Sequence, residues 1–214
     1  MGTVELDLTN KTCTIHSNIL LYGGAISELH RANIQEEISS MWNQPKAIVM
    51  LYDEPYLVQF NIHCWLHYTL TPEQIVHNTN PKNNYIRIES TSSINISFVD
   101  GLGSNTGYFF EENLYKGSTT AAHEYGHTLG LDHPSESDIR GKGVPGIMYP
   151  RGTWVDPTYQ YDPAALPGAP GGTMHPMSRR VLQQDIDLLG LHKLAYTNGS
   201  AVIGSYTNVW HEQH

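Results

Sequence analysis

The sequence predicts an α/β fold in which several strands form a sheet that one long helix covers. Two patterns lead to this prediction: short runs rich in β-branched and aromatic residues alternate with loops, and one longer segment has the spacing of an amphipathic helix. Hydrophobic residues make up 39% of the chain and charged residues 15%, which is typical of a folded globular protein. The 214 residues suffice for one substantial core, so we expect a single domain.

Most of the predicted strands lie in the first half of the chain. Residues 4–23 are rich in Val, Ile, Leu and Thr and are interrupted by a turn at 9–11, which predicts a hairpin or a bent strand. Four further extended runs are predicted at 46–52, 56–70, 85–90 and 94–100.

The long helix is predicted over residues 25–42. Charged residues separate its apolar positions, and Pro45 follows the segment. The apolar positions are Ile26, Leu29, Ile34, Ile38 and Met41. This pattern predicts that one side of the helix packs on the sheet.

Regular structure is predicted to be scarce between His133 and Met177, where Pro and Gly crowd the sequence. The loop at 151–176 is longer than connections usually are, so we expect it to have a role. Ser178 is the predicted N-cap of a closing helix over 179–194. The tail after this helix carries a turn signal at Asn198–Gly199.

The charge pattern narrows the classes of partner. The formal net charge is -9 and no cluster of Lys and Arg is present, so a nucleic acid or an anionic membrane surface is an electrostatically poor partner. Neutral or basic substrates fit better. No run approaches the roughly 18 apolar residues of a membrane span, and the first residues do not have the pattern of a signal peptide.

Cys13 and Cys64 are the two cysteines of the chain. A disulfide requires a short distance between them, which the sequence does not give. One disulfide and two buried free thiols are therefore equally compatible with the sequence.

The segment AHEYGHTLGLDH, residues 122–133, is the strongest candidate for chemistry. Ser118, Thr119 and Thr120 are plausible N-cap residues for a helix that ends at Gly130. On that helix His123 and His127 are four positions apart, so their imidazoles project from one face toward one ion.

His133 can join them only if the helix stops. In a continuing helix it would lie about 9 Å beyond His127 along the axis and about 120° around it. A left-handed turn at Gly130 would bring His133 back to complete a set of three histidines. Three protein ligands leave the fourth position of a tetrahedral zinc ion open, as in catalytic sites. Glu124 beside the first ligand is then the predicted general base.

The simpler interpretation is that these are surface histidines of a histidine-rich chain, which has 12 of them. Five fixed positions coincide by chance in only about 2 of 10,000 chains of this length. We therefore favour the metal site.

Residues 123–133 match the HExxHxxGxxH signature, so the chain resembles the metzincin metallopeptidases. GIMYP at 146–150 resembles the Met-turn of that family, with Met148 as an apolar floor below the histidines. INISFVDG and LQQDIDLL resemble matrix metalloproteinase catalytic domains, where Asp185 falls at the acidic position that holds the Met-turn. Pro134 after the third histidine is similar to serralysins.

The resemblance implies a mixed, twisted sheet of about five strands with a backing helix, an active-site helix, a Met-turn and a C-terminal helix. It implies one catalytic zinc ion on His123, His127 and His133, with Glu124 as catalytic base. Residues 1–214 would form one catalytic domain, with an upper part at 1–133 and a lower part at 134–214. The loop at 151–176 would form the wall of the pocket for the residue after the cut.

The predicted function is zinc-dependent hydrolysis of peptide bonds in proteins. The alternative is a non-catalytic, zinc-stabilised binding module or a toxin domain of a larger secreted protein. We expect a secreted or extracellular monomer that acts on a protein or peptide.

Two further segments have competing interpretations. Residues 106–113 could form an edge strand above the cleft that holds substrate backbone by adding it to the sheet, or Gly107 to Phe110 could form a buried strand, with comparable weight. His63 and His67 are also four positions apart, but the residues around them predict a strand, where the two would lie about 13 Å apart, too far to share an ion.

Overall fold

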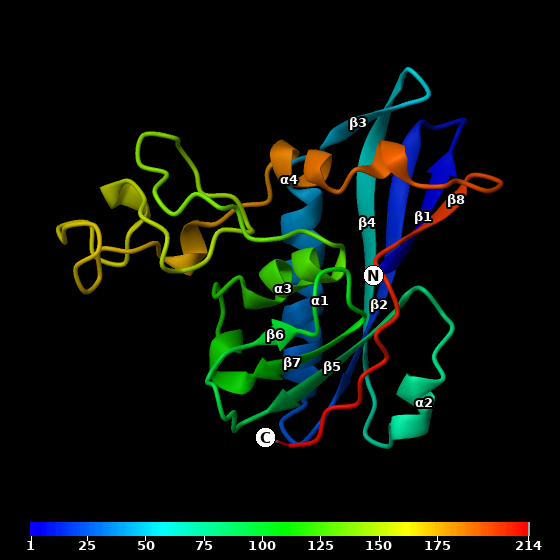
Figure 1. Cartoon of the computed structure of the whole chain (residues 1–214), viewed down its shortest axis with the longest axis horizontal. Helices are drawn as coiled ribbons and strands as arrows, with labels where there is room; N and C mark the ends of the chain where they lie inside the picture. The colour runs from blue at the N-terminus through cyan, green and yellow to red at the C-terminus, as the bar shows by residue number, and fades with distance from the viewer. Residues whose placement is uncertain (214) are drawn as a thin grey trace.

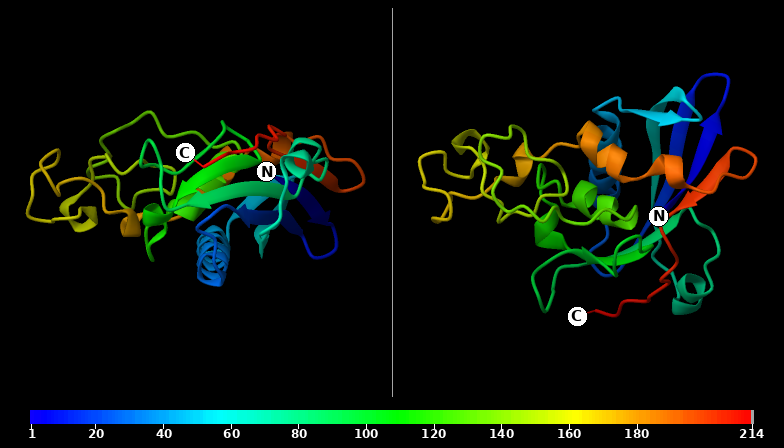
Figure 2. Two further views of the ribbon diagram at one scale, coloured as in Figure 1. Left: turned by 90° about the horizontal axis from the view of Figure 1, so that it is seen from below. Right: turned by 45° about the horizontal axis from the view of Figure 1, so that its top comes forward.

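The computed structural model describes residues 1–213, which form a mixed, twisted sheet with a long helix against one face (Figures 1 and 2). The strand order is β3-β4-β2-β5-β7-β6, and β1 pairs with both β2 and β8. Strands β4, β2, β5 and β7 run parallel, while β3, β6, β1 and β8 pair antiparallel with their neighbours. The strands are β1 Gly2–Asp7, β2 Thr12–Tyr22, β3 Ile48–Leu51, β4 Glu54–Leu66, β5 Asn83–Glu89, β6 Phe98–Val99, β7 Thr106–Phe110 and β8 Ser200–Ile203.

The helices are short apart from the first one. They are α1 Glu28–Asn43, α2 Pro72–Val76, α3 Thr120–Thr128 and α4 Gln183–Leu188, with 3-10 turns at Glu111–Leu114, Pro157–Tyr159, Pro176–Ser178 and Leu191–Lys193. No helix of residues 1–213 is long and apolar enough to cross a membrane.

The sheet has eight strands, not about five as expected. The segment at 4–23 contributes two strands, β1 and β2, and the tail contributes β8. The turn at Asn198–Gly199 forms as predicted, with both residues at positive φ. The strand after it pairs with β1, about 200 residues earlier, and sequence spacing cannot reveal such a pairing.

Helix α1 confirms the predicted backing helix. Ser27 Oγ accepts a hydrogen bond from His30 N at 3.2 Å and caps its first turn. Ile34, Ile38 and Trp42 are buried against the sheet and α3, whereas the predicted apolar position Leu29 is exposed.

The closing helix is shorter than predicted. Ser178 ends a 3-10 turn, and Arg179 and Leu182, which the prediction placed inside the helix, are extended. The reason is tertiary: Arg180 N donates to Pro145 O at 3.0 Å, so this segment pairs with the chain at 145–146. The helix begins only after Leu182, whose N–H donates to Asp185 Oδ2 at 2.8 Å.

The two cysteines are free and buried. Cys13 lies on β2 opposite Val58, and Cys64 of β4 lies opposite Ile19. Six residues along the parallel pair separate them by about 20 Å, so they cannot form a disulfide. Burial raises the pKa of Cys13 to about 11 and that of Cys64 to about 12.

Candidate metal centre

Helix α3 presents two of the three predicted histidines, and α1 holds this helix in place. Ala122, next to His123, is bonded at both of its backbone groups: its N–H donates to Glu37 Oε1 at 3.1 Å, and its carbonyl accepts from Trp42 Nε1 at 3.0 Å. The capping prediction is partly right, since Ser118 Oγ accepts from Thr120 N at 3.2 Å. Thr119 occupies the N-cap position at φ 56 without a side-chain cap bond.

Gly130 makes the turn that the histidine spacing requires. Its φ is +97, and a Cβ there would meet no atom within 4 Å, so the position needs glycine for its conformation and not for space. Leu131 N donates to Gly126 O at 3.1 Å, which closes the end of the helix.

The turn brings the three imidazoles together. Nε2 of His133 lies 3.0 Å from Nε2 of His123 and 3.1 Å from Nε2 of His127. Among residues 1–213 these three side chains form the group of His, Cys, Asp or Glu that could hold a metal ion. His123 and His127 are buried, and His133 lies on the exposed side.

The ring orientations suit metal binding. Nδ1 of His123 lies 2.8 Å from Ile147 O, and Nδ1 of His127 lies 2.7 Å from Leu131 O. Nδ1–H can donate to these carbonyls, which leaves the Nε2 lone pairs directed at the common point. Burial is the main cause that lowers the pKa of all three histidines, which favours the neutral form that binds metal. The donor set therefore fits a zinc ion.

Glu124 lies beside this centre and is 7% exposed. Its carboxylate forms no hydrogen bond or ion pair with any of residues 1–213, and it lines the same hollows as His123 and His133. Burial raises the pKa of Glu124 to about 8, while the positive charge of Arg179 opposes this shift. A carboxyl group without a protein partner is available to a molecule in the hollow, and a divalent ion on the three histidines would favour its ionised form, which can act as a base.

Met148 lies below the helix that carries the histidines. It is buried, and a Cβ added at Gly126 would come within 2.3 Å of its Sδ, so the helix needs a glycine there for space. The carbonyl of Ile147 orients His123, as described above. Asp185 is buried next to Gly146, and burial raises its pKa to about 6 although the backbone of Leu182 and Ile147 opposes this.

Two hollows of about 300 and 310 Å³ flank the centre, and both contain His123, Glu124 and His133. Ile96 and Ser97, just before the edge strand β6, line both of them.

The prediction that residues 106–113 form the edge strand above the cleft is wrong. β7 lies between β5 and β6 and is buried throughout, so the competing interpretation as a buried strand holds.

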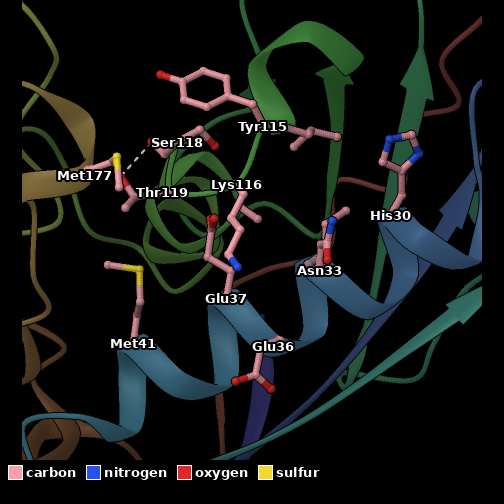
Figure 3. A pocket seen from close by; sticks show the side chains of 14 residues that line it. His30, Asn33, Glu36, Glu37, Met41, Tyr115, Lys116, Ser118, Thr119 and Met177 are labelled. Atoms are coloured by element: carbon pink, nitrogen blue, oxygen red, sulfur yellow. Dashed lines mark hydrogen bonds between the residues drawn. The ribbon is translucent and has the colours of Figure 1, made fainter.

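Three charged residues near the centre were not predicted from the sequence. Glu37 points from α1 toward Thr119 at the start of α3, whereas Glu36 points away (Figure 3). Burial raises the pKa of Glu37, and burial lowers that of Arg179 to about 10, so Arg179 stays protonated at neutral pH. Arg179 and Arg151 line the first hollow. In the sequence all three look like ordinary solvated charges, and no local signal distinguishes them.

The other histidine pair stays apart from the centre. His63 lies on β4 as predicted, with its side chain exposed, and His67 follows the end of that strand. Neither belongs to the group that could hold a metal.

No protein-family model matches the sequence, and no curated protein is significantly similar to it. Among the solved structures that are similar are an archaemetzincin and myroilysin. Archaemetzincin from Methanopyrus kandleri has a TM-score of 0.40 and 12% identity, over 83% of this chain and 95% of that chain. Myroilysin has a TM-score of 0.32 and 16% identity, over 68% of this chain and 60% of that chain. Likeness at this level does not establish the family of this chain.

Proposed function

We propose that this chain is a zinc-dependent endopeptidase of metzincin type. The observation that carries the proposal is the convergence of three imidazole Nε2 atoms beside a buried carboxylate that has no protein partner. In this proposal His123, His127 and His133 hold the ion. Residues 1–214 form one catalytic domain whose cleft lies between the parts at 1–133 and 134–214.

Zinc would supply a Lewis acid that polarises the scissile carbonyl and lowers the pKa of an attacking water toward ~7. Glu124 takes the proton of that water and passes it to the nitrogen of the leaving amine. Because Glu124 is buried and unpaired, the proton transfer requires no prior break of a hydrogen bond. The carbonyls of Ile147 and Leu131 fix the ring orientations of His123 and His127, which keeps the ligand geometry in place during turnover.

Substrate backbone has a place to bind at the edge strand. Within the part of the chain that the structure describes, residues 1–213, β6 pairs only with β7, so its other edge can add an extended peptide. The residues around it line both hollows, so a peptide on this edge would cross the centre.

The test compares the zinc-loaded wild type with Glu124→Gln on casein, with and without a chelator. Gln has the same shape as Glu but cannot act as the base. We therefore expect the variant to bind zinc with wild-type affinity and to keep the wild-type unfolding free energy, while proteolysis is lost. Glu136→Gln, at an exposed carboxylate paired with Lys142, is the matched control and should retain activity.

Cleavage by Glu124→Gln at the wild-type rate would rule out the proposed mechanism. If the wild type binds zinc and folds but cleaves neither casein nor peptides, the non-catalytic binding module becomes the better explanation.

A further inference from the structure

The hollow of about 300 Å³ beside the metal centre contains two arginines that no carboxylate neutralises. Arg179 is 3% exposed, and Arg151 is partly buried. No ion pair within 4 Å involves either guanidinium among residues 1–213. A buried cation without a direct counter-ion is costly, so its position calls for a reason.

The contacts of Arg179 are all with uncharged groups. Nε donates to Thr119 Oγ1 at 2.9 Å, Nη1 to Tyr149 O at 3.1 Å, and Nη2 to Ser118 O at 3.1 Å. Nη1 also lies 2.9 Å from Nδ1 of His123. The three bonds to Thr119, Tyr149 and Ser118 fix the guanidinium in the lining of the hollow and leave its charge unpaired.

The nearest negative groups do not remove this charge. Glu37 and Glu124 act on Arg179 electrostatically, but neither lies within 4 Å of it. Glu37 does not line the hollow, and its carboxylate accepts a hydrogen bond from Ala122 N outside it. The charged side chains that line the hollow are therefore Glu124, Arg151 and Arg179, and a ligand there would meet more positive than negative charge.

Arg151 adds a second guanidinium to the same hollow. Its Nη2 donates to Thr120 Oγ1 at 3.3 Å, and its guanidinium carbon lies 5.7 Å from the centre of the Tyr115 ring. These contacts use few of its donors. Two like charges in one hollow repel each other, and a bound anion would relieve the repulsion.

We propose that this hollow binds a side-chain carboxylate, so that the enzyme prefers substrates with Asp or Glu next to the scissile bond. The inference rests on the proposed peptidase function. The preference concerns residues next to the scissile bond because His123, Glu124 and His133 of the candidate centre line the same hollow as both arginines. Arginine forms strong, directional bonds with carboxylates.

The overall charge of -9 suggested neutral or basic substrates, but that argument concerns long-range forces. Salt screens them beyond about 8 Å at physiological ionic strength, whereas a direct pair in a hollow is screened much less. The local arginines therefore decide the preference at the residue that enters the hollow.

The test uses the zinc-loaded full chain and an acetylated, amidated peptide library in which the positions on both sides of the cut vary. From the peptides that are cleaved, pairs that differ only as Asp against Asn or Glu against Gln are compared. We expect the acidic member to be cleaved with at least about tenfold higher kcat/KM at one of the two positions. A second set with free C-termini separates side-chain carboxylates from chain-terminal ones.

Arg151→Gln should reduce the preference, and Arg151→Glu should reverse it toward Lys or Arg. Arg179→Lys keeps the charge but loses the planar geometry, so it should weaken the preference less than Arg179→Gln. Arg140→Gln removes an equal charge at an exposed position paired with Asp138 and should leave the preference unchanged. Binding of the fluorescently labelled acidic peptide and its amide partner to zinc-loaded Glu124→Gln, measured by anisotropy, gives a readout that does not require turnover.

The outcomes separate the two proposals. If zinc-dependent cleavage is found but the acidic and amide peptides react equally, the peptidase function holds and the carboxylate preference is wrong. The carboxylate preference is also wrong if the Arg151 variants keep the wild-type pattern of cleavage, or if only free C-termini are preferred. If no peptide is cleaved and none binds Glu124→Gln, the proposed function itself fails.

Discussion

Substitution of Gly130 tests the feature on which the candidate centre depends. A left-handed conformation costs an L-residue about 1–2 kcal/mol, and Gly130 has φ +97. Since a Cβ there would meet nothing within 4 Å, Gly130→Ala adds no clash, and the whole cost is conformational. We expect the zinc-free protein to lose about 1–2 kcal/mol of unfolding free energy, measured by urea denaturation.

The same cost appears at the metal site instead if the zinc-free chain relieves the strain by opening the turn. The unfolding free energy of the zinc-free protein then stays near the wild-type value, and the turn must close again when His133 joins the other two histidines. A cost of about 1–2 kcal/mol corresponds to a factor of about 5–30 in zinc affinity, measured by competition with a chromogenic chelator. Gly130→Asn should cost less than Gly130→Ala, because asparagine tolerates this region better. Equal stability and affinity for wild type and Gly130→Ala would refute the role given to this turn.

Two further predictions concern buried groups away from the motif. Because the pKa of Asp185 is raised to about 6 from 3.8, the folded chain holds a proton there that the unfolded chain releases, so this group makes stability fall by about 3 kcal/mol in all as pH rises from about 3 to about 7. Asp185→Asn should remove that part of the pH dependence, seen as the difference between the two zinc-free proteins in urea denaturation; parallel pH profiles would contradict it. The buried Cys13 and Cys64 should not react with a thiol reagent at pH 7.5 in the native state, and two thiols should react after denaturation. Two reactive thiols in the native protein would contradict the burial of the cysteines, and no reactive thiol after denaturation would contradict their free state.

The sequence predicts the candidate centre better than the surrounding fold. The convergence of His123, His127 and His133 follows from helix geometry and one glycine, and these are local properties. Helix α1 is also predicted well, since a helix leaves a periodic pattern in the sequence.

The missed features depend on contacts between distant segments. Arg179 opens a segment that looks helical, but that segment pairs with residues 145–146 and buries the guanidinium beside His123. Residues 200–203 form strand β8 because they pair with β1, which lies about 200 residues earlier in the chain. Glu37 lies among exposed glutamates of α1, and only its position opposite Ala122 makes it different.

The double attachment of Ala122 has a consequence for the comparison of other chains with this one. Glu37 and Trp42 lie 85 and 80 positions before the residue that they hold. A chain could keep every letter of the histidine motif and still lose the helix orientation if these two positions changed. A genome search for the histidine motif alone would count such chains as able to bind the metal ion. A search that also requires a glutamate and a tryptophan five positions apart on the preceding helix would separate chains that keep the helix orientation from chains that have lost it.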